Sequence, residues 1–250
     1  MSRLLTGLLV CCVAAGMQAK ANAAEPLDVI KKAIKAHGGK EKLKKYKAAI
    51  VEGKGTVNTQ GMELKYEAKS QVHYPARYRV EISMNVMGMD ITVLQVMNGK
   101  EGWLKVNDMK TMALPDAQLK AVKTQFLVDE AVRLLPLLDK KKYTLSSVGE
   151  SKVKGKPAIG INITSKAGLD VNFYFDPKTY MIIKYEFQTV NETGKEVMQT
   201  SFLSGFKKFN GMVMPTKLNI QQDGKKFVTA EITKVEFKEK LEASLFEKPK

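Results

Sequence analysis

Hydrophobic and polar residues alternate with a period of two along most of the chain. The clearest case is the segment 62–74, MELKYEAKSQVHY, in which alternate positions are apolar or small and those between them are mostly charged or polar. The segment 78–85 repeats the pattern, and the following run has one apolar face made of Met89, Ile91, Val93 and Met97. Successive side chains of a strand point to opposite faces, so this pattern predicts strands with one buried and one solvated face.

Tight-turn sequences separate these runs at regular intervals. They are TQG at 59–61, NVMG at 85–88, NG at 98–99, NETG at 191–194, NG at 210–211 and DG at 223–224. Asn-Gly and Asp-Gly favour the two-residue turns of β-hairpins. We therefore expect an antiparallel meander of about ten or eleven strands, which is more than one sheet usually holds and should curl.

Two segments have a helical period instead. LDVIKKAIKAH at 27–37 places apolar residues at helical spacing before Gly38-Gly39, which end helices. The segment 115–138 opens with Pro115 and predicts one or two helices, the second stopped at Pro136. A turn is expected through KEKLKKY at 40–46. Together the elements predict an α+β fold.

The N-terminus has the layout of a secretory signal peptide. Arg3 is followed by an apolar run from Leu4 to about Ala15 and by the A-x-A sequence Ala21-Asn22-Ala23. The run is shorter than the roughly 20 residues of a membrane-spanning helix. We predict cleavage after Ala23, which leaves residues 24–250 as one exported domain without cysteine, because Cys11 and Cys12 leave with the peptide.

The chain is basic, with a formal net charge of +15 that falls to +13 when Arg3 and Lys20 are removed with the signal peptide. Such a charge favours anionic partners such as membrane surfaces. Export argues against nucleic acid, and the lysines are spread along the chain rather than clustered. Contact with a membrane is therefore expected to be peripheral.

The exported chain has few residues suited to catalysis. It has two histidines: His37 is expected to cap the first helix, and His73 lies on the polar face of its strand. Asp129 and Glu130 lie within the second helical segment and are expected on a solvated face. No nucleophile, phosphate or dinucleotide motif is found. We expect no enzymatic activity, no cofactor and no metal.

The methionines Met84, Met87 and Met89 have the spacing of thioether ligands for cuprous ion. No histidine or cysteine lies near them to complete a site. Strand alternation requires apolar residues at Met84, Met89 and Met97, whereas Met87 falls in a predicted turn. Flexible methionine also suits an apolar surface whose ligand varies in shape. Ordinary core and a ligand-lining surface both remain open as interpretations.

The order of several short motifs resembles the LolA-like outer-membrane lipoprotein-sorting proteins. These are AHGG after the first helix, NGKEGW (Asn98 to Trp103), the mid-chain helical insertion, YFDPKTY (Tyr174 to Tyr180), NGMVMP (Asn210 to Pro215) and LFEKP (Leu245 to Pro249). The resemblance implies a strongly curved antiparallel sheet, an unclosed half-barrel, with helices over its concave face. It also implies an apolar cavity between sheet and helices that receives acyl chains without covalent chemistry.

The predicted cavity lining combines the apolar strand face with the helical insertion. Its residues are Leu64, Tyr66, Val80, Ile82, Met84, Met89, Ile91, Val93, Met97, Leu119, Val122, Phe126, Leu134 and Leu135. In the family, an arginine directly before the proline of a strand opening is tied to lid closure. Here Tyr74 precedes Pro75, so we assign that role to neither Arg77 nor Arg79.

The sequence thus predicts a monomeric periplasmic carrier that binds the acyl chains of lipoproteins or lipids and sorts them to the outer membrane. Inner- and outer-membrane proteins of lipoprotein transport are candidate partners. The alternative is an envelope lipid sensor or interaction module on the same fold, which would hold a stable protein partner. An enzyme with an unrecognised site is the third hypothesis.

Overall fold

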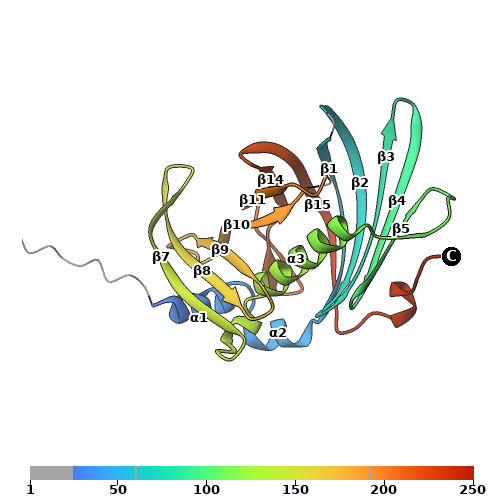
Figure 1. Cartoon of the computed structure of the whole chain (residues 1–250). Helices are drawn as coiled ribbons and strands as arrows, with labels where there is room; N and C mark the ends of the chain where they lie inside the picture. Colours follow the sequence, from blue (N-terminus) through green and yellow to red (C-terminus); the bar gives the residue numbers. More distant parts are fainter. Residues whose placement is uncertain (1–24, 60, 192) are drawn as a thin grey trace, which may run out of the picture.

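The computed structural model describes residues 25–59, 61–191 and 193–250, so the predicted signal peptide lies outside the described residues. Thirteen strands pair antiparallel in one sheet, in the order β6-β5-β4-β3-β2-β1-β15-β14-β11-β10-β9-β8-β7 (Figure 1). The edge strands β6 and β7 do not pair with each other, so the sheet is an unclosed half-barrel. The predicted α+β half-barrel is confirmed.

The strands follow the hydrophobic alternation closely. Their bounds are β1 Ala48–Thr59, β2 Met62–His73, β3 Arg77–Val86, β4 Met89–Asn98, β5 Glu101–Val106, β6 Met112–Ala113, β7 Tyr143–Val153, β8 Lys156–Ser165, β9 Asp170–Phe175, β10 Ile182–Val190, β11 Glu196–Ser204, β14 Lys217–Gln222 and β15 Lys225–Lys238. A separate hairpin contains β12 Lys207–Phe209 and β13 Met212–Met214. The expected ten or eleven strands are therefore too few.

Hairpin turns occur where the sequence predicts them. Met87-Gly88 joins β3 to β4, Asn210-Gly211 joins β12 to β13, and Asp223-Gly224 joins β14 to β15; all six residues have positive φ. Two successive positive φ angles define the type I′ turn, whose twist matches that of the flanking strands. These turns fix the register that keeps one apolar face per strand on the same side of the sheet.

Two glycines of β1 allow an unusually close approach of β15, and the register shifts beside one of them, between Glu52 and Gly53. A Cβ on Gly55 would overlap the carbonyl oxygen of Thr229, and a Cβ on Gly53 would lie 2.8 Å from the carbonyl oxygen of Glu231. The β15 backbone thus approaches β1 over positions that only glycine can fill without displacing the neighbouring strand. The pairing of β1 with β15 joins the strands β1 to β6 to the rest of the sheet.

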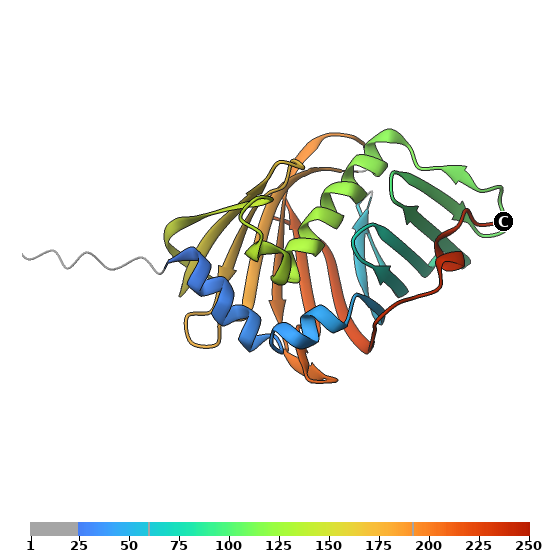
Figure 2. The ribbon, with the colours of Figure 1, turned by 90° about the horizontal axis from the view of Figure 1, so that it is seen from below.

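The helices pack on one face of the sheet, which we call the inner face. They are α1 Pro26–Ala36, α2 Lys40–Lys45, α3 Asp116–Val132 and the 3₁₀ turn η1 Leu135–Leu138. α1 and α2 follow one end of the sheet, and α3 crosses diagonally over it, closest to β10 (Figure 2). A second 3₁₀ turn, η2 Ala243–Phe246, packs against β3 and β4.

The helical predictions need two corrections. The segment 40–45, expected as a turn, is the helix α2, and Gly39 precedes it with φ 87°. The segment 115–138 forms two helical elements, but the second does not stop at Pro136: α3 ends at Val132, Leu134 has φ 63°, and η1 contains Pro136. Residues before proline avoid the helical conformation, and Leu134 turns the chain just ahead of that restriction.

Candidate functional site

The inner face of the sheet is divided into two halves with different burial. The half formed by β7 to β11 is sealed by α1, α3 and η1 in one continuous core, with Phe173, Phe175 and Ile163 fully buried. Aromatic rings pack against one another within it, and the tilted rings of Phe173 and Tyr185 have centroids 5.9 Å apart. We call this part of the inner face the sealed half, because its core side chains are buried under the helices.

The other half, formed by β2 to β4, has the same alternation but is only partly covered. Its inner-face side chains are half-buried, and we call them the apolar strip: Leu64, Tyr66, Ala68, Ile82, Met84, Ile91 and Val93. Register brings them together, because Tyr66 pairs with Met84 and Met84 pairs with Ile91. None of these residues belongs to the continuous core of the sealed half.

Burial of this face increases from one end to the other. At the β3–β4 turn, Met87 is 84% exposed and Met89 is 62% exposed. At the opposite end, Val80 and Met97 are buried. There α3 begins close to the sheet, since a Cβ on Gly102 would lie 2.5 Å from Leu114 Cδ1 and 3.1 Å from Leu119 Cδ1. The strip therefore runs from an exposed rim to a covered inner end.

The predicted lining residues fall into four groups. Leu64, Tyr66, Ile82, Met84, Ile91 and Val93 lie on the strip, with Leu119 and Val122 half-buried on α3. Val80, Met97 and Phe126 are buried at the inner end, and Met89 lies at the exposed rim. Leu134 and Leu135 pack against the core of the sealed half instead, so the structure does not bring them to the strip.

A cluster of polar side chains lies at the boundary between the two halves. Gln199 of β11 donates from Nε2 to Gln125 Oε1 at 3.0 Å, and Gln125 Nε2 donates to Asp129 Oδ1 at 2.8 Å. The negative charge of Asp129 contributes to raising the pKa values of three tyrosines, Tyr74, Tyr78 and Tyr185. Sequence reasoning missed this cluster, although the alternation placed Tyr78 on the apolar face of its strand.

Asp129 is partly buried, so the prediction of a solvated face is wrong for this residue. Burial removes water from the carboxylate and raises its pKa to about 6, while the hydrogen bond from Gln125 acts in the opposite direction. The carboxyl group is thus easier to protonate than an exposed aspartate. Burial also raises the pKa values of Tyr74 and Tyr78, which keeps both phenols neutral.

Arg133 lies one helical turn beyond Asp129 but is engaged elsewhere. Its Nη2 donates to the carbonyl oxygens of Leu43 at 3.1 Å and Tyr46 at 2.9 Å. Its guanidinium carbon stands 4.3 Å from the ring centroid of Tyr74, whose other neighbour is Phe126 at 5.6 Å between centroids. Arg133 therefore ties the end of α3 to α2 and to the β2–β3 loop.

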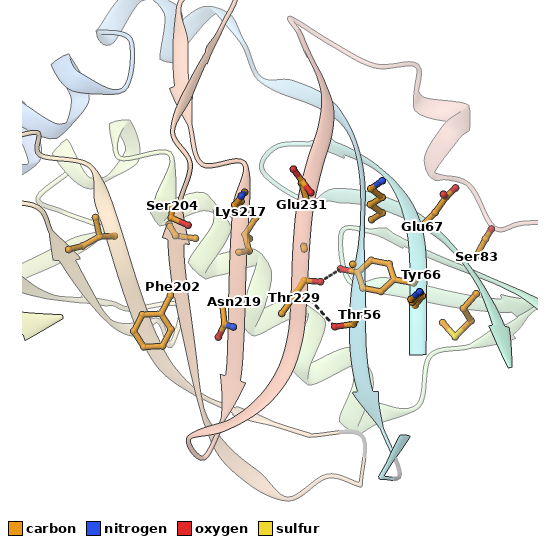
Figure 3. A pocket seen from close by; sticks show the side chains of 18 of the residues that line it. Thr56, Tyr66, Glu67, Ser83, Phe202, Ser204, Lys217, Asn219, Thr229 and Glu231 are labelled. Carbon is orange, nitrogen blue, oxygen red and sulfur yellow. Dashed lines mark hydrogen bonds between the residues drawn. The ribbon is translucent and has the colours of Figure 1, made fainter. Parts of the chain in front are cut away.

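A large groove of about 1200 Å³ lies on the opposite, outer face of the sheet. Figure 3 shows its side chains on β11, β14, β15, β1 and β2, including Phe202, Asn219, Thr229 and Thr56. Thr56 Oγ1 and Thr229 Oγ1 are 2.8 Å apart, and Asn219 Oδ1 is buried without a partner among the described residues. Tyr66, Met84 and Ile91 reach this groove, although their strand parity assigns their side chains to the inner face.

The outer groove does not suit an acyl chain. Cross-strand register places Lys217 and Lys54 beside Glu231, and Lys54 also beside Glu67. Opposite charges in such positions stabilise a solvated sheet face. Burying them under a hydrocarbon chain would cost more than the chain gains, since buried charges need hydrogen-bonding partners. The apolar strip is the better candidate for a hydrophobic ligand.

The histidines have structural roles. His37 ends α1, as predicted, and its ring Nδ1 donates to the carbonyl oxygen of Ala33 at 2.9 Å, while burial lowers its pKa. His73 is less exposed than predicted, with its ring 6.4 Å from that of Phe246. Among the described residues no cluster of three acidic or histidine side chains is placed to bind a metal, and no helix has the length and hydrophobicity to span a bilayer.

Comparison with protein-family models gives no match, and comparison with curated proteins gives none. Solved structures do match. A LolA superfamily protein from Nitrosomonas europaea has a TM-score of 0.56 at 13% identity, covering 90% of this chain and 99% of that one. A domain assigned to an outer membrane lipoprotein-sorting protein from Vibrio parahaemolyticus has a TM-score of 0.54 at 13% identity, covering 91% and 98%.

A DUF1329 family protein from Desulfovibrio piger is similar to the same extent, with a TM-score of 0.55 at 12% identity over 89% of this chain and 97% of that one. These likenesses extend over nearly the whole of each structure, whereas the sequences have diverged. They show that the chain has the LolA-like fold, and the fold resemblance inferred from the sequence is confirmed.

Proposed function

We propose that the protein binds the acyl chain of a lipid or lipoprotein reversibly on the apolar strip and carries it within the cell envelope. The observation that carries this proposal is the contrast in burial on one sheet face. Seven apolar or small side chains of the strip stay half-buried beside a core that is fully sealed. An apolar surface left open in this way marks a binding site.

The energetics are adequate for binding without polar recognition. Each buried methylene group contributes about 0.8 kcal/mol, so an acyl chain laid against the strip gains several kcal/mol. Methionine at 84 and 89 adapts to chains of different shape. The binding is non-covalent, so the protein is proposed as a carrier and not an enzyme. Its LolA-like fold and predicted export support a periplasmic location for this activity, and its positive charge favours brief contact with anionic membranes.

The proposal is tested by native mass spectrometry of gently purified protein, in which co-purified phospholipid or acylated peptide is expected. Met84→Asp places a charge on the strip and should abolish binding of a fluorescent acyl probe. Ser83→Asp, the matched control, places the same charge on the exposed outer face of the same strand and should bind normally.

A consistently empty wild-type protein, or equal probe binding by the two variants, would contradict the carrier function. A stable protein partner recovered in a pull-down together with an empty protein would support the sensor alternative.

A further inference from the structure

Polar side chains lie just beyond the covered end of the apolar strip. Tyr78 lies on the inner face of β3, beyond Val80 and Ile82 as seen from the methionine rim. It is close enough to Asp129 of α3 to interact with its charge. From Tyr78 to Met84 the strand extends about 20 Å, at roughly 3.3 Å per residue. A chain lying along the strip therefore has its inner end beside Asp129 and its outer end at the methionine rim.

Asp129 has no positive partner. Its Oδ1 accepts the hydrogen bond from Gln125, but within the described ranges no donor reaches Oδ2 and no cation forms an ion pair with the carboxylate. Arg133, the nearest cation along the helix, is directed to the carbonyl oxygens of Leu43 and Tyr46. A partly buried carboxylate without a counter-charge is unfavourable, and an incoming cation would relieve it.

Tyrosines from three separate elements lie close enough to this carboxylate to interact with its charge, and the Gln199–Gln125–Asp129 hydrogen bonds hold the carboxylate between α3 and β11. Tyr74 comes from the β2–β3 loop, Tyr78 from β3 and Tyr185 from β10. The faces of such rings attract cations, and a carboxylate among aromatic rings is the chemistry that receives an ammonium group. One of these rings, that of Tyr74, already contacts a cation, the guanidinium of Arg133.

We propose that Asp129 and Tyr78 bind the ammonium group of an amphiphile whose acyl chain lies along the apolar strip. The ligand class is then an aminolipid or another long-chain amine, in preference to neutral or anionic amphiphiles. The proposal rests on the acyl-binding function proposed above. Asp129 and Tyr78 are both partly exposed, which leaves part of their surface for a headgroup.

Protonation of Asp129 sets a pH limit on this site. The groups that face it are Gln125 on α3, Tyr74, Tyr78 and Tyr185; Arg133 and Glu130 act on Tyr74. Burial raises the pKa values of the three tyrosines, so they stay neutral at physiological pH, whereas Asp129 has a pKa of about 6. Acidification from pH 7.5 to 5 should therefore remove most of the preference for an amine.

The test compares dodecylamine with dodecanol, which share one chain length and differ in charge. By calorimetry at pH 7.5, the wild-type protein should bind the amine at least tenfold more tightly. Asp129→Asn should erase this difference and leave binding of the alcohol unchanged. Glu130→Gln removes the same charge one position away and should keep the preference, which makes it the matched control.

Equal affinity of wild type for the two compounds, or an amine preference that survives Asp129→Asn, overturns the ammonium site while acyl binding stands. Failure of both compounds to bind overturns the acyl-binding function and the site with it. If Asp129→Asn does not fold, the pH series on wild type replaces it: a preference unchanged between pH 7.5 and 5 overturns the proposal.

Discussion

The two halves of the inner face are made from the same alternation of residues but differ in how deeply their side chains are buried. In the sealed half, Phe173 and Ile163 are fully buried under α1 and α3. On the apolar strip, Ile82 and Met84 occupy equivalent positions and stay half-exposed. Strand pattern fixes which face is apolar, and the placement of the helices decides whether that face becomes core or binding surface.

The largest expected effect is in the sealed half. Phe173→Ala removes a fully buried ring that contacts Phe175 and Tyr185. Loss of contacts and the cavity left behind should lower the free energy of unfolding by about 3 to 5 kcal/mol. Urea denaturation followed by circular dichroism measures this. A loss under about 1 kcal/mol would mean that this half is not sealed.

The boundary between the halves should respond to pH through Asp129. Its folded pKa, about 6, lies above the ordinary value of 3.8, so ionisation destabilises the folded state at neutral pH and this penalty disappears as pH falls from 6 toward 4. Asp129→Asn should therefore raise the free energy of unfolding at pH 7, by at most about 3 kcal/mol, and by little at pH 4.

Urea denaturation of both proteins at pH 7 and pH 4 checks this expectation. Burial lowers the pKa of His37, so its contribution to stability is lost as pH falls below 6.5, with the opposite slope. Since both proteins carry His37, the difference between them isolates Asp129. An equal difference at the two pH values would contradict the buried carboxylate.

A smaller effect is expected where α3 starts to cover the strip. Gly102→Val would drive a side chain into Leu114 and Leu119, the first close contact with Leu114 Cδ1 being at 2.5 Å. Overpacking should lower the free energy of unfolding by about 1 to 3 kcal/mol, and displacement of α3 should change acyl-probe affinity. Gly102→Ala adds only the first carbon at the same position and should lower the free energy of unfolding less, which makes it the graded control.

The smallest effect on stability is expected on the strip itself. Ile82→Ala shortens a half-exposed side chain, so the free energy of unfolding should fall by only about 1 kcal/mol. The acyl probe should nevertheless bind up to roughly tenfold more weakly, because the ligand loses about the same apolar contact. A stability loss as large as that of Phe173→Ala would show that the strip is filled core.

The curved sheet was predictable because its long strands alternate without interruption. Some of the strands beyond the expected number are short: β6 has two residues and β12 and β13 have three each, too few to show a period. Helix α1 was predictable from its spacing and the glycines behind it. The break at Leu134 was not, because a positive φ at leucine is set by tertiary packing around Leu134 and Leu137.

The strip residues followed from strand parity, which is a local property. That the helical insertion faces these strands followed from the family resemblance. Which of its residues do so did not, since the position of α3 depends on contacts with β10 and η1, and Leu134 and Leu135 pack against the sealed half. The solvent exposure of Asp129 was also predicted wrongly. A helix such as α3 that is half-buried around most of its circumference gives no clear polar face from which to predict solvent exposure.

The pairing of β1 with β15 determines how the chain can fold. Thr56 and Thr229, which share a hydrogen bond in the middle of the sheet, are 173 residues apart. The strands on either side form mostly by hairpins between neighbours, which is fast, whereas this central pairing closes the longest loop in the described chain and is expected to be slow. The strands on each side of this pairing are therefore expected to form their hairpins before β1 and β15 pair.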